Sequence, residues 1–363
     1  MFVVVLTALV VSNLVSALDQ NYTYSNAICS IVAATNVADI SGYSMWQCNE
    51  TNYPATSPCG DAPWNGTLCN ITGFPEAISE IHLGVTGLEG TIPSAVGLLS
   101  SLQYLYMYKG KLNGTVPSSV GSLSSLLGWG LFRNSLTGTI PSSFLNLRAL
   151  RYMYMFQNSF TGTIPSEIGT LTSLIDFEIS DNLMSGSIPP EIGSSSSLAA
   201  IVLYGNYFTG SLPSTFGLLT FVTDLQLFGN CLSGGMPSEL GLMSSLKIMG
   251  FSSNRFSGDI PSSLGSLSEI QMMFLELNSL TGTLPDTLTS LSTLQYIYCY
   301  NNMLNGTVPS SIGAMSSLIA LGLSDCSFSG SIPDGIGSLT SLELFFLNGN
   351  CLTGRACCLL LRG

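Results

Sequence analysis

Charged residues, histidine and long apolar segments are all scarce in this 363-residue chain. Only 8% of the residues are charged, and nine basic residues against 21 acidic ones give a net charge of −12. Nucleic acid is therefore excluded as a partner, because binding to a phosphate backbone needs clustered Lys and Arg. His82 is the only histidine, which excludes a His-based catalytic triad and a multi-histidine metal site.

The longest apolar segment is the N-terminus, residues 1–17. It ends in Val15-Ser16-Ala17, the small-x-small pattern of a signal peptidase site. The segment contains Asn13 and is shorter than the roughly 20 apolar residues of a spanning helix, so we expect a cleaved signal peptide. An uncleaved membrane anchor is the alternative, because the segment has no Lys or Arg. Both interpretations place the protein outside the cell or at its surface.

Sequons and cysteines agree with export. Asn-x-Ser/Thr sequons, which accept glycans only in the secretory pathway, occur at Asn21, Asn49, Asn65, Asn70, Asn113 and Asn305. Four of the ten cysteines, Cys29, Cys48, Cys59 and Cys69, lie in residues 18–74. In an oxidising compartment they predict two disulfides in an N-terminal cap.

A 24-residue repeat fills most of the chain. Prolines recur at this exact interval at positions 93, 117, 141, 165, 189, 213, 237, 261, 285, 309 and 333, and a glycine stands three residues before each of them. The glycine series continues to Gly354, where a twelfth unit begins. Self-similarity at such a period is typical of a solenoid, so residues 75–354 are expected to form one repeat domain.

Each repeat carries apolar residues fifteen, twelve and ten positions before its proline, in the pattern LxxLxL, as at Leu102, Leu105 and Met107. The last two of these are two residues apart, which places them on one face of a short strand. One unit cannot bury that face alone, but stacked units bury it together. The pattern predicts a parallel sheet along the inner wall of the solenoid.

Asparagine recurs seven residues before the proline, at Asn134, Asn158, Asn182, Asn206, Asn230, Asn254, Asn278, Asn302 and Asn350. The chain turns inward after each strand and leaves backbone groups unpaired, which a buried amide can satisfy. We therefore expect a ladder of asparagines, interrupted at Gly110 and Cys326. The segment after each proline, Pro-Ser-Ser-x-x-Gly in most repeats, predicts a short helical turn on the outer wall.

The repeat LTGTIPSSxxxLxxLxxLxLxxN resembles the plant-type leucine-rich repeat, found in plant receptor kinase ectodomains and polygalacturonase-inhibiting proteins. Residues 59–69, CGDAPWNGTLC, are similar to the cysteine-bounded cap of that family. The resemblance implies an α/β solenoid, a right-handed superhelix with short 3-10 or helical turns on its outer wall, and the disulfides Cys59–Cys69 and Cys29–Cys48. The segment 325–330, DCSFSG, with Cys231 and Cys351, is also similar to leucine-rich-repeat surface antigens of kinetoplastid protists.

In that family the ligand usually meets inner-wall residues that point away from the core, which here lie thirteen, eleven and nine positions before each proline. The predicted ligand-binding residues are Tyr104, Tyr106, Tyr108, Phe132, Tyr152, Tyr154, Phe156, Asp176, Glu178, Tyr204, Asp224, Phe228, Phe274, Tyr296, Tyr298 and Tyr300. So many outward tyrosines favour contact with a peptide, protein or glycan, because the ring offers a rigid surface with a polar tip. Tyrosine columns that only stabilise the sheet are the alternative.

The remaining polar residues give no catalytic or metal site. Asp176 and Glu178 have the spacing of a glycosidase carboxylate pair, but no repeat element closes over them, and a solvated acidic patch is expected. Six later cysteines, Cys231, Cys299, Cys326, Cys351, Cys357 and Cys358, lack zinc-ligand spacing, and their pairing stays open, with Cys326 and Cys351 on adjacent units. We expect no enzyme activity, no metal and no cofactor.

The sequence favours an extracellular, non-catalytic binding scaffold for a peptide, protein or polysaccharide, with a membrane-bound co-receptor as a further partner. The alternative is a structural surface antigen or coat glycoprotein without one dedicated ligand. Residues 355–363, RACCLLLRG, depart from the repeat, which predicts a chain truncated or altered at this end. A natural stop, with cysteines holding the tail over the last repeat, is the other interpretation.

Overall fold

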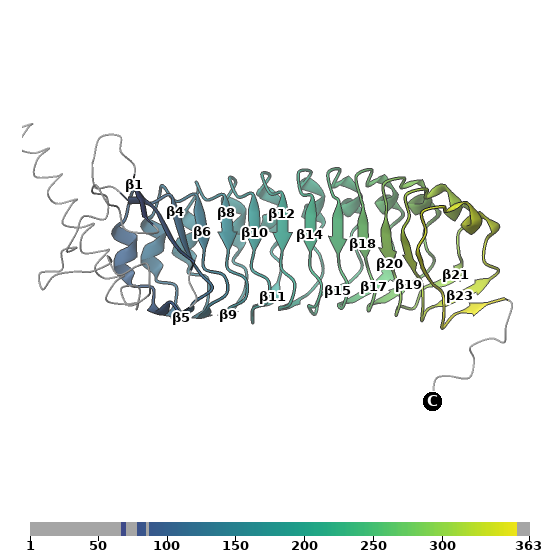
Figure 1. Cartoon of the computed structure of the whole chain (residues 1–363), viewed down its shortest axis with the longest axis horizontal. Helices are drawn as coiled ribbons and strands as arrows, with labels where there is room; N and C mark the ends of the chain where they lie inside the picture. The colour runs from purple at the N-terminus through teal and green to yellow at the C-terminus, as the bar shows by residue number, and fades with distance from the viewer. Residues whose placement is uncertain (1–66, 70–77, 85–86, 354–363) are drawn as a thin grey trace, which may run out of the picture. The chain divides into compact units, whose positions relative to one another are not determined.

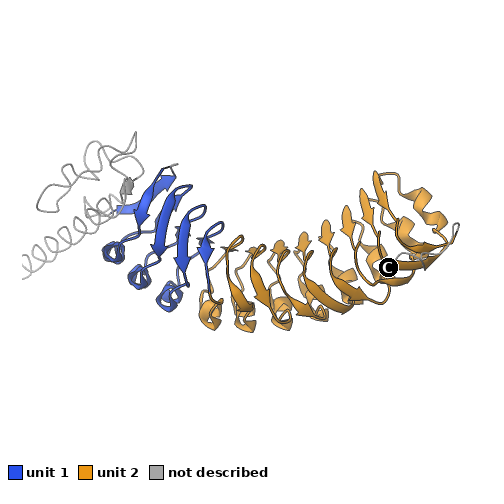
Figure 2. Cartoon of the chain, turned by 90° about the horizontal axis from the view of Figure 1, so that it is seen from below, with its two compact units in different colours: residues 1–161 blue, residues 162–363 orange. Residues whose placement is uncertain are grey.

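The computed structural model describes residues 67–69, 78–84 and 87–353. The predicted signal peptide, most of the cap with its proposed disulfides, and the irregular tail lie outside these residues. The chain divides into two compact units, residues 1–161 and residues 162–363, coloured separately in Figure 2. The described repeats share one order of elements, an inner-wall strand, a second short strand and a 3-10 turn, and the described residues end after the second strand of the last repeat.

In the first unit, the inner-wall strands lie in the order β1-β2-β4-β6-β8. β1 is antiparallel to β2, whereas β2, β4, β6 and β8 pair in parallel, each shifted by one repeat. Their bounds are β1 (Thr67–Cys69), β2 (Ile78–Gly84), β4 (Tyr104–Tyr108), β6 (Gly128–Gly130) and β8 (Tyr152–Tyr154). The second strands are β3 (Glu89–Thr91), β5 (Lys111–Thr115), β7 (Ser135–Gly138) and β9 (Ser159–Phe160), and the turns are η2 (Ser94–Leu98), η3 (Ser118–Ser122) and η4 (Ser142–Asn146).

The second unit continues the same design, and its inner-wall strands lie side by side in Figure 1. They are β10 (Asp176–Glu178), β12 (Ala200–Val202), β14 (Asp224–Gln226), β16 (Ile248–Gly250), β18 (Met272–Phe274), β20 (Tyr296–Tyr298), β22 (Ala320–Gly322) and β24 (Leu344–Phe346). The second strands are β11 (Ser185–Ser187), β13 (Tyr207–Thr209), β15 (Ser233–Gly234), β17 (Arg255–Asp259), β19 (Ser279–Thr281), β21 (Asn305–Thr307), β23 (Ser327–Gly330) and β25 (Cys351–Leu352).

The repeat prolines occupy equivalent places, as the 24-residue interval predicts. Each stands at the N-cap of a 3-10 turn, and nearly all have extended backbone angles, such as φ −65° and ψ 135° at Pro213. Proline suits this place because its ring fixes φ and the first turn does not need its missing N–H. In the second unit the turns are η5 (Ser166–Thr170), η6 (Pro190–Ser194), η7 (Ser214–Leu218), η8 (Ser238–Leu242), η9 (Ser262–Ser266), η10 (Asp286–Ser290), η11 (Ser310–Ala314) and η12 (Asp334–Ser338).

The core lies between the inner-wall strands and the turns. The LxxLxL residues fill it, and Leu102, Leu105 and Met107 are 0 to 1% exposed. Trp129 takes one of these positions, is fully buried and meets Phe144 edge-on at 5.4 Å between ring centroids. Burial of these apolar surfaces is what makes each repeat depend on its neighbours.

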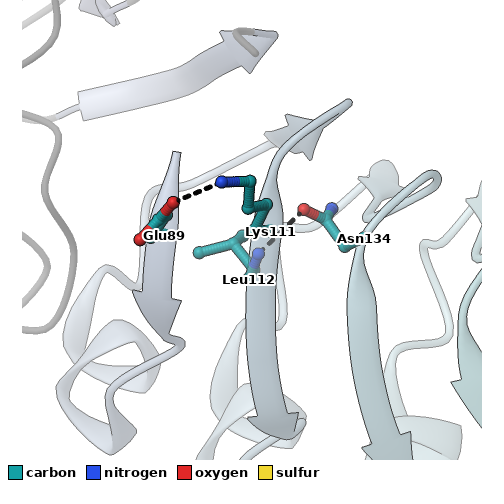
Figure 3. Close-up of polar contacts among 4 residues, drawn as sticks. All are labelled: Glu89, Lys111, Leu112 and Asn134. Atoms are coloured by element: carbon teal, nitrogen blue, oxygen red, sulfur yellow. Dashed lines mark hydrogen bonds and ion pairs between the residues drawn. The ribbon is translucent and has the colours of Figure 1, made fainter. Parts of the chain in front are cut away.

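The asparagine ladder forms as predicted. Asn206 is representative: its Oδ1 accepts the backbone N–H of Met184 at 3.0 Å, and its Nδ2 donates to the carbonyls of Ile179 and Leu203 at 3.0 and 3.2 Å. Asn134 does the same in the first unit, where its Oδ1 accepts the Leu112 N–H at 3.2 Å (Figure 3). Each amide therefore joins its own turn to the preceding repeat.

The two interruptions of the ladder differ. At Gly110 only the backbone bond common to the repeats remains: Lys111 N donates to the Leu88 carbonyl at 2.6 Å, as Tyr207 N donates to the Met184 carbonyl beside Asn206. At Cys326 the thiol donates to the Cys299 carbonyl at 3.5 Å, which is the carbonyl one repeat earlier that an asparagine would reach. Sulfur is a weaker partner than an amide, so this turn keeps only part of the usual hydrogen bonding.

Candidate ligand-binding surface

The inner wall of the first unit presents a cluster of aromatic side chains. Tyr104, Tyr106 and Tyr108 stand on β4, and Tyr152 and Tyr154 stand on β8. Phe132 and Phe156 follow β6 and β8, and all seven predicted residues of this unit are partly exposed. We call these seven residues the aromatic wall.

The rings of the aromatic wall stack on one another. Phe132 lies 4.6 Å from both Tyr108 and Phe156 between ring centroids, with interplanar angles of 15° and 14°. Tyr104 and Tyr106 stack at 6.1 Å, and Tyr152 and Tyr154 at 6.2 Å. These contacts explain why the tyrosines are half-buried rather than fully facing solvent, and they hold the rings in fixed positions.

Two glycines make room for this arrangement. Gly128 and Gly130 are the inner-wall residues of β6, and both are buried beneath the tyrosines of β4. A Cβ at Gly128 would lie 2.6 Å from Cδ1 of Tyr104, and one at Gly130 would overlap the Tyr106 ring. Both glycines lie at outward positions of the repeat, thirteen and eleven residues before Pro141, but the repeat period alone does not place the Tyr104 and Tyr106 rings over them.

Charged groups around the aromatic wall are paired. His82 Nε2 lies 2.9 Å from Glu80 Oε2, and the His82 ring lies 5.1 Å from that of Tyr106. Among the basic residues near the wall, Lys111 forms an ion pair with Glu89 at 2.8 Å (Figure 3), and Arg133 Nε donates to Gln157 at 2.8 Å. Lys109 Nζ lies 5.8 Å from the centroid of the Tyr108 ring. All three basic residues are exposed, so these are solvated surface contacts.

The inner wall of the second unit carries a group of acidic side chains on its first strands, β10 and β14. Asp176 and Glu178 on β10 and Asp224 on β14 surround the small residues Ala200 and Val202 of β12. Burial and the neighbouring Asp176 and Asp224 raise the pKa of Glu178. Burial also raises the pKa of Asp224, against a hydrogen bond from Gln226 Nε2 at 3.0 Å that lowers it.

The aromatic residues of the second unit fall into two groups. Tyr204 and Phe228 stack at 4.3 Å with an interplanar angle of 8°. Phe274 meets Tyr298 at 5.6 Å, and Tyr298 meets Tyr300 at 6.0 Å. Tyr296 stands on the same strand as Tyr298, β20, and is partly exposed.

Glu276 is a residue of this surface that the prediction omitted. It lies between Phe274 and the tyrosines of the next repeat, and burial raises its pKa against hydrogen bonds from its own backbone and from Ser252. The sequence signal was its place nine residues before Pro285, which is an outward position of the repeat.

The predicted glycan sites and the later cysteines can be followed only in the described part of the chain. Asn113 on β5 and Asn305 on β21 are exposed, as glycan acceptors must be, whereas Asn21, Asn49, Asn65 and Asn70 lie outside the described residues. Cys231, Cys299, Cys326 and Cys351 are free thiols, so Cys326 and Cys351 are unpaired here. Burial raises the pKa of the Cys299 thiol, which keeps it protonated.

Comparison with known proteins identifies the family. The family description "Leucine Rich Repeat" matches residues 149–171, 245–267 and 317–339. The Arabidopsis receptor kinase HAESA, solved with the peptide hormone IDA and the co-receptor SERK1, is 28% identical, with a TM-score of 0.77 over 90% of this chain and 54% of that one. The chain is a plant-type leucine-rich-repeat protein.

Two further structures support this membership. The plant peptide hormone receptor RGFR1 in complex with RGF2 is 31% identical, with a TM-score of 0.65 over 74% of this leucine-rich-repeat protein and 46% of that chain. PEPR1–AtPEP1 is 28% identical, with a TM-score of 0.66 over 91% and 52% of the two chains. The protein thus spans about half the length of these structures. Comparison with curated proteins gives no match.

No helix in the described part of the chain, residues 67–69, 78–84 and 87–353, is long and apolar enough to cross a membrane. Within residues 78–84 and 87–353, no group of three or more His, Cys, Asp or Glu side chains is arranged to hold a metal ion.

Proposed function

We propose that this leucine-rich-repeat protein is an extracellular, non-catalytic scaffold that binds a peptide or a protein segment through its aromatic wall. One observation carries the proposal: seven partly exposed aromatic rings on β4, β8 and the adjoining turns are held rigid by mutual stacking and by the buried Gly128 and Gly130. Rigid rings with polar tips lose little conformational entropy on binding, which is why tyrosine is frequent in binding surfaces.

The similar structures support the peptide class of ligand. HAESA and RGFR1 are solved with peptide hormones, and HAESA also with a co-receptor. A peptide on the inner wall, and a membrane-bound co-receptor beside it, are therefore the partners we propose here. Such ectodomains act by binding, which agrees with the expectation that the protein is not an enzyme and works at the cell surface or beyond it.

A display experiment tests this function. The secreted full-length protein, immobilised, is panned against a random dodecapeptide library, and recovered peptides are measured against a variant with Tyr104, Tyr106, Tyr152 and Tyr154 replaced by Ala. We expect the variant to lose binding by a factor of about 100 or more, because hot-spot aromatics each contribute roughly 2 kcal/mol. Tyr207→Ala is the matched control, since Tyr207 is 57% exposed on the second strand β13.

Circular dichroism of the quadruple variant must match the wild-type spectrum. If the variant unfolds, the four tyrosines stabilise the sheet. Peptide binding by the double variant Tyr152→Ser/Tyr154→Ser then decides whether binding also depends on these two side chains. Unchanged binding in a folded variant would refute the proposal.

A coat glycoprotein without one dedicated ligand is the second candidate function. Two exposed sequon asparagines, Asn113 and Asn305, favour it, because both are placed to carry glycans on the second strands, away from the inner wall. Peptide, protein and glycan arrays that all fail to bind the wild-type protein, together with glycans mapped to both asparagines, would favour this function.

A further inference from the structure

The cluster of Phe274, Glu276, Tyr298 and Tyr300 differs in ring geometry from the other contacts between outward Tyr and Phe side chains. Outward Tyr and Phe pairs elsewhere are close to parallel, with interplanar angles of 8° to 23°. Here the angles are 31° for Phe274 and Tyr298 and 54° for Tyr298 and Tyr300. A tilted pair covers less of each ring face than a stacked pair does.

The carboxylate of Glu276 has an unmet hydrogen-bonding capacity. Its Oε2 atom is buried and has no hydrogen-bond partner, a property that among the described carboxylate oxygens it shares only with Oδ1 of Asp224. Leaving a buried charged oxygen unpaired costs more than the roughly 1–3 kcal/mol of a neutral group. A group that persists at such a cost indicates a missing donor.

The missing donor does not come from the same unit. Between residues 162 and 353 the sequence has 14 acidic residues and two basic ones, Lys247 and Arg255. Arg255 stands on the second strand β17, and Lys247 precedes β16 with an exposed side chain. No described residue forms an ion pair with Glu276. The described residues of this unit therefore leave Glu276 without a cationic partner.

We propose that Glu276, Phe274, Tyr298 and Tyr300 form a subsite for the guanidinium group of an arginine side chain in a peptide or protein ligand. The inference rests on the proposed function, since it assigns one contact of a ligand on the inner wall. The guanidinium is planar, weakly hydrated and rich in N–H donors, so it can lie against a tyrosine face while it donates to a carboxylate. An ammonium group is more strongly hydrated and lacks the planar face.

Gly322 fixes the position of the two tyrosines. A Cβ on Gly322 would lie 2.7 Å from Cδ1 of Tyr298 and 3.3 Å from Cδ1 of Tyr300, so both rings lie over this residue of β22. Ala320 on the same strand is also buried. The rings are thus supported from one side, which preorganises the subsite as Gly128 and Gly130 preorganise the aromatic wall.

Fluorine NMR tests the subsite directly. Full-length protein labelled with 3-fluorotyrosine is titrated with N-acetylarginine amide, and with N-acetylcitrulline amide as the uncharged isostere. Resonances of Tyr298 and Tyr300 are assigned from Tyr298→Phe and Tyr300→Phe variants. We expect both resonances to shift saturably with the arginine probe, with a dissociation constant on the order of 1 mM, and to stay in place with citrulline.

Two isosteric variants separate the subsite from general charge effects. Glu276→Gln keeps the shape and removes the charge, and we expect it to weaken the arginine probe about tenfold, as loss of a charge-assisted hydrogen bond does. Glu269→Gln makes the same change at an exposed residue outside the inner wall and leaves the titration unchanged. Equal responses to arginine and citrulline, or an unaltered titration of Glu276→Gln, would overturn the inference.

The peptide-library experiment tests the aromatic wall, and the arginine titration tests the subsite, so the two proposals can fail separately. Peptides recovered by the wild-type protein, together with no arginine response at Tyr298 and Tyr300, leave the proposed function standing and remove the subsite. A specific arginine response without recovered peptides supports the subsite and counts against peptide binding by the aromatic wall.

Discussion

Replacing Asn206 with alanine measures what one rung of the asparagine ladder contributes. Asn206 is 5% exposed and bonds four backbone groups: the Met184 N–H, the carbonyls of Ile179 and Leu203, and, at 3.3 Å, the carbonyl of Tyr204, which also accepts the Asp181 N–H. The Ile179 and Leu203 carbonyls also keep another partner, because Asn182 Nδ2 reaches Ile179 O at 3.1 Å and Asn230 Nδ2 reaches Leu203 O at 3.1 Å. Only the Met184 N–H is left without its ladder acceptor.

The expected loss follows from this arrangement. An unsatisfied buried N–H costs about 1–3 kcal/mol, and the weakened Ile179 and Leu203 carbonyls add about 0.5 kcal/mol each, giving roughly 2–4 kcal/mol in total. Because repeat proteins are stabilised by neighbour interactions, the loss should appear first between the repeats that contain Met184 and Asn206. A peptide covering Met184 should therefore exchange its amide hydrogens faster than the other peptides of the second unit.

The assay combines urea denaturation, followed by circular dichroism, with hydrogen exchange read by mass spectrometry. Asn146→Ala is the control, since Asn146 is exposed on η4 and its loss should stay within about 0.5 kcal/mol. If Asn206→Ala lowers the urea midpoint no more than Asn146→Ala, or if amide exchange at Met184 is unchanged, the side-chain amide of Asn206 does not stabilise the fold as proposed.

Three further predictions concern packing, pH and disulfides. Gly130→Val should displace the Tyr106 ring, lowering thermal stability and changing the near-ultraviolet tyrosine spectrum, because a Cβ there overlaps that ring. Burial raises the pKa of Glu178, Asp224 and Glu276 in the folded protein, so their ionisation destabilises the fold. Stability should therefore rise as the pH falls from neutral through these raised pKa values towards the ordinary carboxyl range, and replacing all three with their amides should flatten this dependence. Mass mapping of the non-reduced protein should show Cys59 linked to Cys69, and a free Cys59 thiol would contradict the proposed cap.

The repeat could be predicted in detail because its signals are local and periodic. The proline interval located the turns, the LxxLxL triplets located the buried strand faces, and the asparagine series located the ladder. Each signal depends on a short-range rule, such as the fixed φ of proline or the two-residue period of a strand, and every repeat applies it again.

The binding surface was predictable only in part. The outward positions on each strand follow from the same period, which is why the aromatic residues could be named in advance. How far each ring is exposed depends on the residue one repeat later, which lies 24 positions away in sequence and beside it in the sheet. That is why the roles of Gly128, Gly130 and Gly322 appear only in the structure.

Periodic local rules in the sequence are enough to set the leucine-rich-repeat architecture, the residues of the core and the face that meets solvent. The three-dimensional packing alone sets which outward rings stack, which glycines lie beneath them, and that Glu276 has a buried oxygen without a donor. These properties depend on side-chain angles and on burial between neighbouring strands, and a repeat period does not specify either of them.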